Sequence, residues 1–234
     1  MLSKLLFLGV ALTASLATAD QSHDIKTAIT NKEKLNALKP EDWVFDFEKS
    51  TNPSYTFVPG SVNNANAGTW PAAVGTGMTV ALLNLGPCSI LPAHWHPRAT
   101  NFVVITHGSV KTWMLNENGV EPIETLLTGK KMTIFPAGSL HFMENTGCEN
   151  AQLVSALNSE DHGTTNALNS LLLLGNTRLA TLLGASNGTV ESFFHEGKAG
   201  AGIQGVGTAS QYGNPACIAR CGLKVPFEEN TKLN

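Results

Sequence analysis

Short apolar runs separated by Gly, Pro and Asn characterise the chain between residues 43 and 157. Many short runs of this kind, each bounded by turn-forming residues, predict the strands of a β-sandwich or β-barrel. The sequence Asn-Glu-Asn-Gly at Asn116–Gly119 predicts a turn between two of these strands. The expected strands are Trp43–Phe47, Met78–Leu85, Phe102–Thr106, Val110–Leu115, Lys131–Phe135 and Gln152–Leu157.

Helical patterns are expected on both sides of this β-rich segment. A short helix is expected before it, at Ile29–Leu38. After it, Gly175 and Gly184 stand where helices are expected to stop. Six glycines between residues 197 and 213, with few apolar residues among them, predict a mobile or extended arm. The expected C-terminal helices are Asn166–Leu174, Thr177–Leu183 and Val190–His195.

The first nineteen residues have the pattern of a secretory signal peptide. Lys4 supplies a positive charge, Leu5–Leu16 is an apolar stretch, and Ala17–Ala19 has the small residues of a cleavage site. No later stretch approaches the roughly 20 apolar residues that a membrane-spanning helix needs. The sequence therefore predicts a soluble, secreted protein whose mature form begins at Asp20. Export would make Asn187, in the sequon Asn-Gly-Thr, an acceptor for N-glycosylation.

A chain of 234 residues can bury one good core and still form a single domain. The expected organisation is a signal peptide at 1–19, an N-terminal polar extension at 20–39, a barrel at 40–160, a C-terminal helical segment at 161–196 and a glycine-rich C-terminal arm at 197–234.

The charge pattern gives no sign of a polyanionic partner. The chain has 15 Lys and Arg against 18 Asp and Glu, a formal net charge of −3, and no cluster of basic residues. Nucleic acids and anionic membrane surfaces usually recruit such clusters. We therefore expect neither a nucleic acid nor a membrane as a partner.

Four cysteines, Cys88, Cys148, Cys217 and Cys221, fit an oxidising compartment. Four cysteines permit three pairings, and sequence alone does not choose among them. The spacing of Cys217 and Cys221 could also supply half of a zinc site. No matching pair of His or Cys lies nearby, so disulfides are the favoured interpretation.

Two stretches of the β-rich segment carry the candidate chemistry. His94 and His96 are two positions apart on an expected strand, so their side chains point to the same face. Pro136–Gly138 predicts a tight turn into a second strand, on which His141 and Asn145 share one face. A third imidazole presented in this way could complete a facial set of nitrogen ligands, which zinc, copper, iron and nickel accept.

Other polar residues near the two stretches have simpler interpretations. Glu144 is three residues from His141, so it should face the opposite side of the strand. Glu121 and Glu124 are expected at the solvent-exposed surface between the two stretches. Arg98 could orient a substrate carboxylate, but a structural salt bridge beneath a loop is favoured. His107 and His162 are expected in loops, and Trp95 is expected to pack on the outer face of the barrel. His23 and His195 have no partner pattern around them.

The first stretch resembles the first sequence motif of the cupin superfamily. That motif is written as Gly, five residues, His-x-His, three or four residues, Glu, six residues and Gly. His94, His96 and Gly108 match it at the stated spacing. Two positions depart from it, because Asn101 stands where the motif has Glu and Gly86 lies two residues too early.

The second stretch matches the second cupin motif, Pro-x-Gly, two residues, His, three residues, Asn, throughout residues 136–145. The run His-Pro-Arg-Ala-Thr at 96–100 further resembles germin-like proteins and the spherulins of slime moulds and fungi. The likeness covers roughly residues 40–195. It implies an all-β core, the cupin jelly-roll β-barrel (double-stranded β-helix), followed by short C-terminal α-helices.

Carried over residue by residue, the resemblance implies that His94, His96 and His141 bind one divalent transition metal ion, with Asn101 at the usual fourth position. In germins the ion is manganese, and oxalate oxidase or superoxide dismutase activity accompanies it. A carboxylate beside three imidazoles leaves a divalent ion with one uncompensated positive charge, whereas an amide leaves two. Manganese prefers hard oxygen ligands, so Asn101 is expected to favour copper, zinc or iron instead.

Two classes of function fit this sequence. One is a secreted germin-like cupin that acts as a metal-dependent oxidoreductase on a small organic acid or a reactive oxygen species. The other is a non-catalytic extracellular cupin that holds a metal or small ligand, or serves in stress or storage. A three-histidine site with an open position is a competent Lewis acid, and could take an anionic substrate as its missing negative ligand.

The resemblance also implies a homo-oligomer. In germins, helices after the barrel clasp a neighbouring subunit. The apolar segments Leu171–Leu174 and Leu179–Leu183 would suit such a contact. The alternative is that these helices pack against their own barrel.

Overall fold

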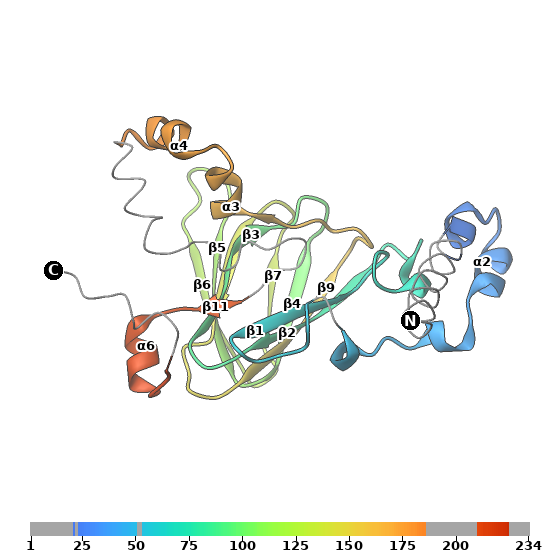
Figure 1. Cartoon of the computed structure of the whole chain (residues 1–234), viewed down its shortest axis with the longest axis horizontal. Coiled ribbons are helices and arrows are strands. Elements are labelled where there is room, and N and C mark those ends of the chain that lie inside the picture. The colour runs from blue at the N-terminus through green and yellow to red at the C-terminus, as the bar shows by residue number, and fades with distance from the viewer. Residues whose placement is uncertain (1–20, 22, 51–52, 186–209, 225–234) are drawn as a thin grey trace, which may run out of the picture.

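The computed structural model describes residues 21, 23–50, 53–185 and 210–224 (Figure 1). The expected signal peptide, the Asn187 sequon, the helix expected at Val190–His195 and the glycine-rich segment as far as residue 209 lie outside the described residues. No helix within the described ranges is long and apolar enough to cross a membrane.

Two antiparallel sheets form the barrel in the middle of Figure 1. The first has the strand order β1-β2-β9-β4-β7, and the second has the order β10-β3-β8-β5-β6, with β11 also paired to β3. The strands are β1 (Gly60–Ala65), β2 (Thr79–Leu85), β3 (Ser89–Trp95), β4 (Asn101–His107), β5 (Ser109–Leu115), β6 (Ile123–Thr128), β7 (Met132–Phe135), β8 (Leu140–Glu144), β9 (Ala151–Leu157), β10 (Thr165–Asn166) and β11 (Gln211–Tyr212). This arrangement confirms the expected jelly-roll fold with an all-β core.

One hydrophobic core lies between the sheets because alternate residues of each strand point inward. In β9 every second residue from Ala151 to Leu157 is buried, while the residues between them are half-buried. The side chains of Leu85, Val103 and Leu153 have no exposed surface. Burying a side chain of this size contributes roughly 1.5–3 kcal/mol, so the core supplies a rigid frame for whatever its strands carry.

Five of the six expected strands are confirmed as β2, β4, β5, β7 and β9. The strand expected at Trp43–Phe47 is wrong. Two 3-10 helices occupy this region, η1 (Pro40–Trp43) and η2 (Phe47–Lys49). Asp46 caps η2 by accepting a hydrogen bond from the backbone N–H of Glu48 at 3.1 Å. Trp43 is 54% exposed, and no residue of this run belongs to the buried core.

Strand β1 has a polar sequence, and the pattern of apolar residues did not predict it. Ser61 and Asn63 are nevertheless fully buried. The Asn63 side chain donates to the backbone carbonyl of Pro53 at 2.6 Å, and the Asn84 side chain donates to Ser61 Oγ at 3.1 Å. These hydrogen bonds satisfy polar groups that would otherwise be costly to bury.

Short helices flank the barrel, as expected. The N-terminal helix α2 (Asn31–Ala37) begins with a capping box between Thr30 and Glu33. Gly184 ends one of the C-terminal helices in the left-handed conformation, with φ of 62°. A further short 3-10 helix, η3 (Pro71–Ala73), precedes β2. The C-terminal helices are α3 (Ala167–Leu172), α4 (Asn176–Leu183) and α6 (Pro215–Arg220).

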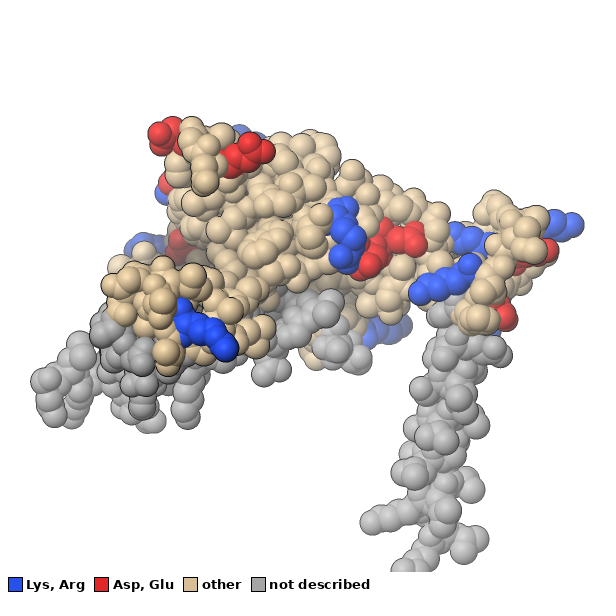
Figure 2. All heavy atoms as spheres, turned by 90° about the horizontal axis from the view of Figure 1, so that it is seen from above, with Lys and Arg blue, Asp and Glu red and all other residues tan. Residues whose placement is uncertain are grey.

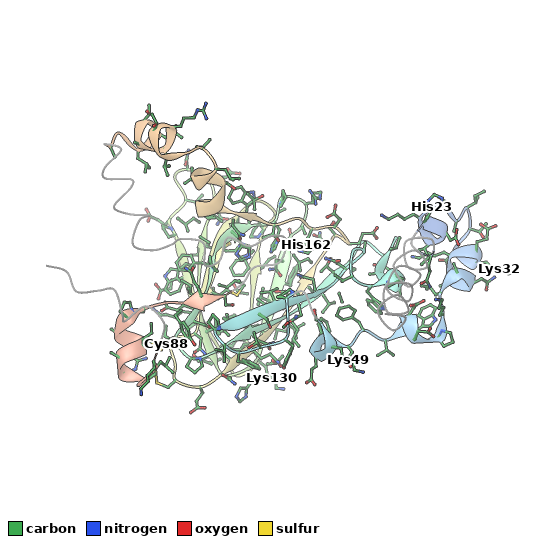
Figure 3. The ribbon with its side chains drawn as sticks, viewed as in Figure 1. His23, Lys32, Lys49, Cys88, Lys130 and His162 are labelled. Atoms are coloured by element: carbon green, nitrogen blue, oxygen red, sulfur yellow. A yellow bond between two sulfur atoms is a disulfide. The ribbon has the colours of Figure 1, made fainter. Side chains whose placement is uncertain are left out.

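Two disulfides join the C-terminal end of the described chain to the barrel. They pair Cys88 with Cys217 and Cys148 with Cys221. Cys88 and Cys217 are buried with Ile218 in a small cluster of their own, and Figure 3 shows Cys88 next to α6. No described cysteine is free, which confirms disulfides rather than half a zinc site.

The face shown in Figure 2 has no large patch of one charge. Basic and acidic side chains lie scattered among wide uncharged areas there. One pair, Arg98 with Asp161, connects residues 63 positions apart at 2.8 Å.

Candidate metal centre

A β-bulge turns His94 toward the inside of the barrel. Leu91 pairs with Met143 and His94 pairs with His141, so β3 has one more residue than β8 between these two pairs. Leu91 and His94 therefore both point inward although they are three positions apart. Pro92 lies inside the bulge, where its missing N–H costs no ladder hydrogen bond.

The second turn connects the two histidine-bearing stretches. Gly138 adopts φ of +81°, a conformation that glycine reaches without strain. Its backbone N–H donates to the carbonyl of His96 at 2.9 Å, so the turn before β8 is tied to the end of β3. Asn145, at the far end of β8, donates to the carbonyls of Leu85 and Gly86. Asn145 thus fixes the strand rather than joining the histidines.

His94, His96 and His141 come together in the barrel interior. Their ring centroids are separated by 4.4 Å for His94 and His141, 5.2 Å for His94 and His96, and 5.4 Å for His96 and His141. Each offers a nitrogen, and these nitrogens all lie within 4.8 Å of one another. All three residues are less than 9% exposed. This group could hold a metal ion.

Backbone carbonyls orient all three rings in the same way. The Nδ1 atoms of His94, His96 and His141 lie 2.7, 2.7 and 2.9 Å from the carbonyls of Pro92, Gly163 and Ser139 respectively. A carbonyl only accepts, so each Nδ1 carries the hydrogen and each Nε2 keeps its lone pair. Histidines that ligate metals almost always have such a partner behind the ring.

Asn101, at the start of β4, lines the same pocket as His94 and His96. It is 2% exposed, and its Oδ1 atom is buried without a hydrogen-bond partner. Nε2 of His141 is also buried without a partner. Buried polar atoms are normally paired. Asn101 Oδ1 and His141 Nε2 are therefore two unpaired acceptor atoms that could both bind a cation at this site.

Burial keeps the imidazoles neutral. Desolvation, and then the neighbouring His96, lower the pKa of His94 to about 4. Desolvation and the nearby His94 lower the pKa of His141 well below its usual range, and desolvation lowers the pKa of His96. None of the described residues that line the pocket is acidic. The site therefore presents only uncharged donors at neutral pH.

Acidification is expected to destabilise the protein after metal removal. An unfolded histidine has a pKa of about 6.5, whereas folded His94 has a pKa of about 4. Between these values the unfolded chain binds a proton that folded His94 does not, so the free energy of unfolding falls as the pH falls. For His94 alone the loss between about pH 7 and about pH 4.5 is about 2 kcal/mol. Urea unfolding of the chelated protein from about pH 7 to about pH 4.5 measures it.

His94→Leu should flatten this pH dependence, and His107→Ala, at an exposed histidine, should leave it unchanged. An unfolding free energy that is the same across this range would contradict the expectation.

The remaining polar residues lie where the simpler interpretations put them. Glu121 and Glu124 are exposed, and Glu124 pairs with Lys111 at 2.5 Å. Glu144 alternates with the buried His141 and Met143 along β8 and points away from the imidazoles. His23 and His107 are exposed, and His195 lies outside the described residues. Trp95 is half-buried on β3, a strand that α3 contacts. Arg98 forms the salt bridge to Asp161.

His162 differs from its expected role as an ordinary loop residue. It does lie in the loop between β9 and β10, but it is only 6% exposed and lines the pocket. Ser155, on β9, also lines the pocket, and its Oγ is buried without a partner. Neither residue has a motif around it. For Ser155, a polar position in the inward-facing register of an otherwise apolar strand was the available signal.

Residues 47–184 match the sequence profile of the cupin family. Together with the jelly-roll barrel, this match shows that the chain belongs to the cupin family.

Among its relatives, the chain is 29% identical to Spherulin-1B of Physarum polycephalum over 216 residues, which cover 89% of this chain and 81% of the relative. It is 29% identical to germin-like protein subfamily 3 member 1 of Arabidopsis thaliana over 150 residues, covering 61% and 72% respectively. Among solved structures, a recombinant oxalate oxidase in complex with glycolate superposes with a TM-score of 0.61 and 21% identity, over 71% of this chain and 86% of that one. At this identity the structural likeness shows the fold.

Proposed function

We propose that this chain is a secreted, germin-like cupin that binds one divalent transition metal ion through His94, His96 and His141, with Asn101 at the fourth position. The observation that carries the proposal is the common orientation of the three rings. Each Nδ1 is engaged by a backbone carbonyl, which leaves three Nε2 lone pairs within one small group. Such a donor set is typical of sites for transition metals.

The bound ion would supply Lewis acidity at an open coordination position. Around it, Asn101 and the three imidazoles contribute no negative charge, and no described pocket residue is acidic. The positive charge of the metal ion would therefore be uncompensated, which favours an anionic small molecule as a further ligand. An oxidoreductase acting on a small organic acid or a reactive oxygen species is the catalytic form of this proposal.

The alternative is a non-catalytic cupin that holds metal or a small ligand outside the cell. The replacement of the usual carboxylate by Asn101 favours it, because a carboxylate would stabilise a higher oxidation state of the metal. The same replacement favours copper, zinc or iron over the manganese of germins.

Elemental analysis of the purified protein, before and after chelation, tests the site. We expect copper, zinc or iron rather than stoichiometric manganese. Asn101→Glu should raise the affinity for Mn(II) at least about tenfold, or about 1.4 kcal/mol, because it restores a hard anionic donor. Asn118→Glu, at an exposed position, is the matched control.

Stoichiometric manganese in the unmodified protein, accompanied by oxalate oxidase or dismutase activity, would show that Asn101 does not have this effect. Failure to bind any metal at micromolar concentration would remove the three-histidine site itself.

Secretion forms part of the proposal, and two disulfides support it because such bonds persist in oxidising compartments. N-terminal sequencing of the protein recovered from culture medium tests it. A mature chain that begins at Asp20 is the expected result.

We further expect the protein to form a homo-oligomer through α3 and α4. Leu173, Leu182 and Leu183 are 88%, 67% and 63% exposed, whereas Leu179 is buried. Leu182 and Leu183 lie on α4, and Leu173 directly follows α3. Exposed apolar side chains on this segment suit contact with a second copy. Sedimentation at micromolar concentration should give more than a monomer, and Leu182→Lys should reduce the assembly more than Thr181→Lys. A monomer in the unmodified protein would contradict this expectation.

A further inference from the structure

A fourth imidazole stands beside the three-histidine group. The ring centroid of His162 lies 5.0 Å from that of His96, a separation no greater than the 5.2 Å between His94 and His96. His162 is buried and lines the pocket together with His94, His96 and Asn101. Figure 3 places it among the strands of the barrel, well away from Cys88.

The hydrogen bonds of Thr79 determine which nitrogen of the His162 ring carries the hydrogen. Thr79 Oγ1 donates its single hydrogen to the carbonyl of Ser159 at 2.7 Å. It can therefore only accept from His162 Nδ1, which lies 3.3 Å away. His162 thus carries its hydrogen on Nδ1 and its lone pair on Nε2, as His94, His96 and His141 do. This is the pattern of a ligand with a partner behind it.

The loop that carries His162 is fixed in place. The backbone N–H of Arg98 donates to the carbonyl of His162 at 3.2 Å, and the Arg98 side chain contacts Asp161 twice, at 2.7 and 2.8 Å. Gly163 accepts from His96 Nδ1, so the same loop orients a member of the three-histidine group. Gly163 has φ of +66°, and an added Cβ would lie 2.9 Å from side-chain atoms of Pro97 and Arg98. Preorganisation of this kind is what a ligand loop requires.

With Asn101 at the fourth position, the metal site lacks a strong fourth donor. Its amide is neutral and weak, and none of the described pocket residues supplies a carboxylate. A fourth imidazole would give an all-nitrogen set, which copper(II) and zinc accept and manganese(II) disfavours. The ligand atoms of the first three histidines lie within 4.8 Å of one another, and His162 does not belong to that set. Ligation by His162 therefore requires its ring to move closer to the other three.

We propose that His162 is a fourth imidazole ligand of the metal site and takes the place of the carboxylate that Asn101 replaces. Arg98, through its hold on the loop, is then a positioning residue for that ligand. The proposal rests on the three-histidine site proposed above.

Electron paramagnetic resonance of the unmodified protein, loaded with one equivalent of Cu(II), tests this directly. Four coupled imidazole nitrogens are the expected result, and no variant has to fold for the measurement. His162→Gln and His162→Ala should each lose one coupled nitrogen. Each should weaken Cu(II) binding by more than about 100-fold, beyond the roughly 10–100-fold that an outer-shell partner costs. His107→Ala, which removes an exposed histidine, should change neither quantity.

Three coupled nitrogens in the unmodified protein, or Cu(II) affinity in His162→Gln within about threefold of the unmodified protein, would overturn the role of His162. The three-histidine site would survive that result as long as His94→Ala and His141→Ala still abolish binding. If these two variants also retain Cu(II), the three-histidine site fails as well, so the two failures are distinguishable.

Discussion

His141→Ala is expected to abolish specific metal binding while the barrel stays folded. His141 is 1% exposed, and its Nε2 atom has no hydrogen-bond partner within the protein. Removing one of the imidazole donors should lower the affinity at least about 1,000-fold, well beyond the roughly 10–100-fold cost of losing an outer-shell partner. Metal content after dialysis and a competition titration measure this loss.

Stability should respond differently from metal binding. The His141 ring stacks on Phe135, with centroids 4.1 Å apart and planes 8° from parallel. Truncation to alanine therefore leaves a cavity and should lower the free energy of unfolding by about 3 kcal/mol. His141→Phe keeps an aromatic ring beside Phe135 and removes the unpartnered nitrogen, so it should lose the metal with a smaller loss of stability than His141→Ala.

Thermal unfolding monitored by circular dichroism separates these effects. Metal retained by His141→Phe would argue against ligation. If both variants unfold, His141 has a mainly structural role.

Removal of the disulfide between Cys148 and Cys221 is the second large effect that we expect. The two cysteines are 73 residues apart, and closing a loop of that length in the unfolded chain contributes about 4 kcal/mol in the chain-entropy description. The double variant Cys148→Ser with Cys221→Ser should melt about 10 °C lower, given roughly 2–4 °C per kcal/mol for a chain of this size.

Metal binding should be nearly unchanged in that double variant, because none of the proposed ligands contacts these cysteines. His141→Phe should show the reverse pattern, with metal lost and most of the stability retained. A disulfide variant that lost both metal and stability would show that the C-terminal segment holds the site together.

The barrel strands with alternating apolar residues were predictable from the sequence, because every second residue of strands such as β9 has to face the core. Strand β1 was not, since buried hydrogen bonds to Ser61 and Asn63 replace apolar contacts there. The run Trp43–Phe47 is apolar but ends one 3-10 helix and begins another instead of pairing with a strand. Local composition carries no information about such tertiary partners.

Some residues of the candidate site were likewise predictable from the sequence, and others were not. The spacing of His94 and His96 is local and places both on one face. The resemblance to the two cupin motifs was needed to bring His141 together with them. His162 reaches the pocket because Arg98, far away in the chain, holds its loop. A contact of that sort depends on the closed barrel, so no short sequence pattern around His162 could report it.

Segments that follow the barrel strands cover the outer edge of β3. Without neighbours on that side, the strand that carries His94 would present unpaired backbone groups to any other extended chain. β10 pairs with its end at His94 and Trp95, and β11 pairs with its beginning at Ser89 and Ile90. The disulfides keep β11 close to that edge. Reduction of the disulfides is therefore expected to leave the beginning of β3 without its covering strand, and so to favour strand-to-strand aggregation.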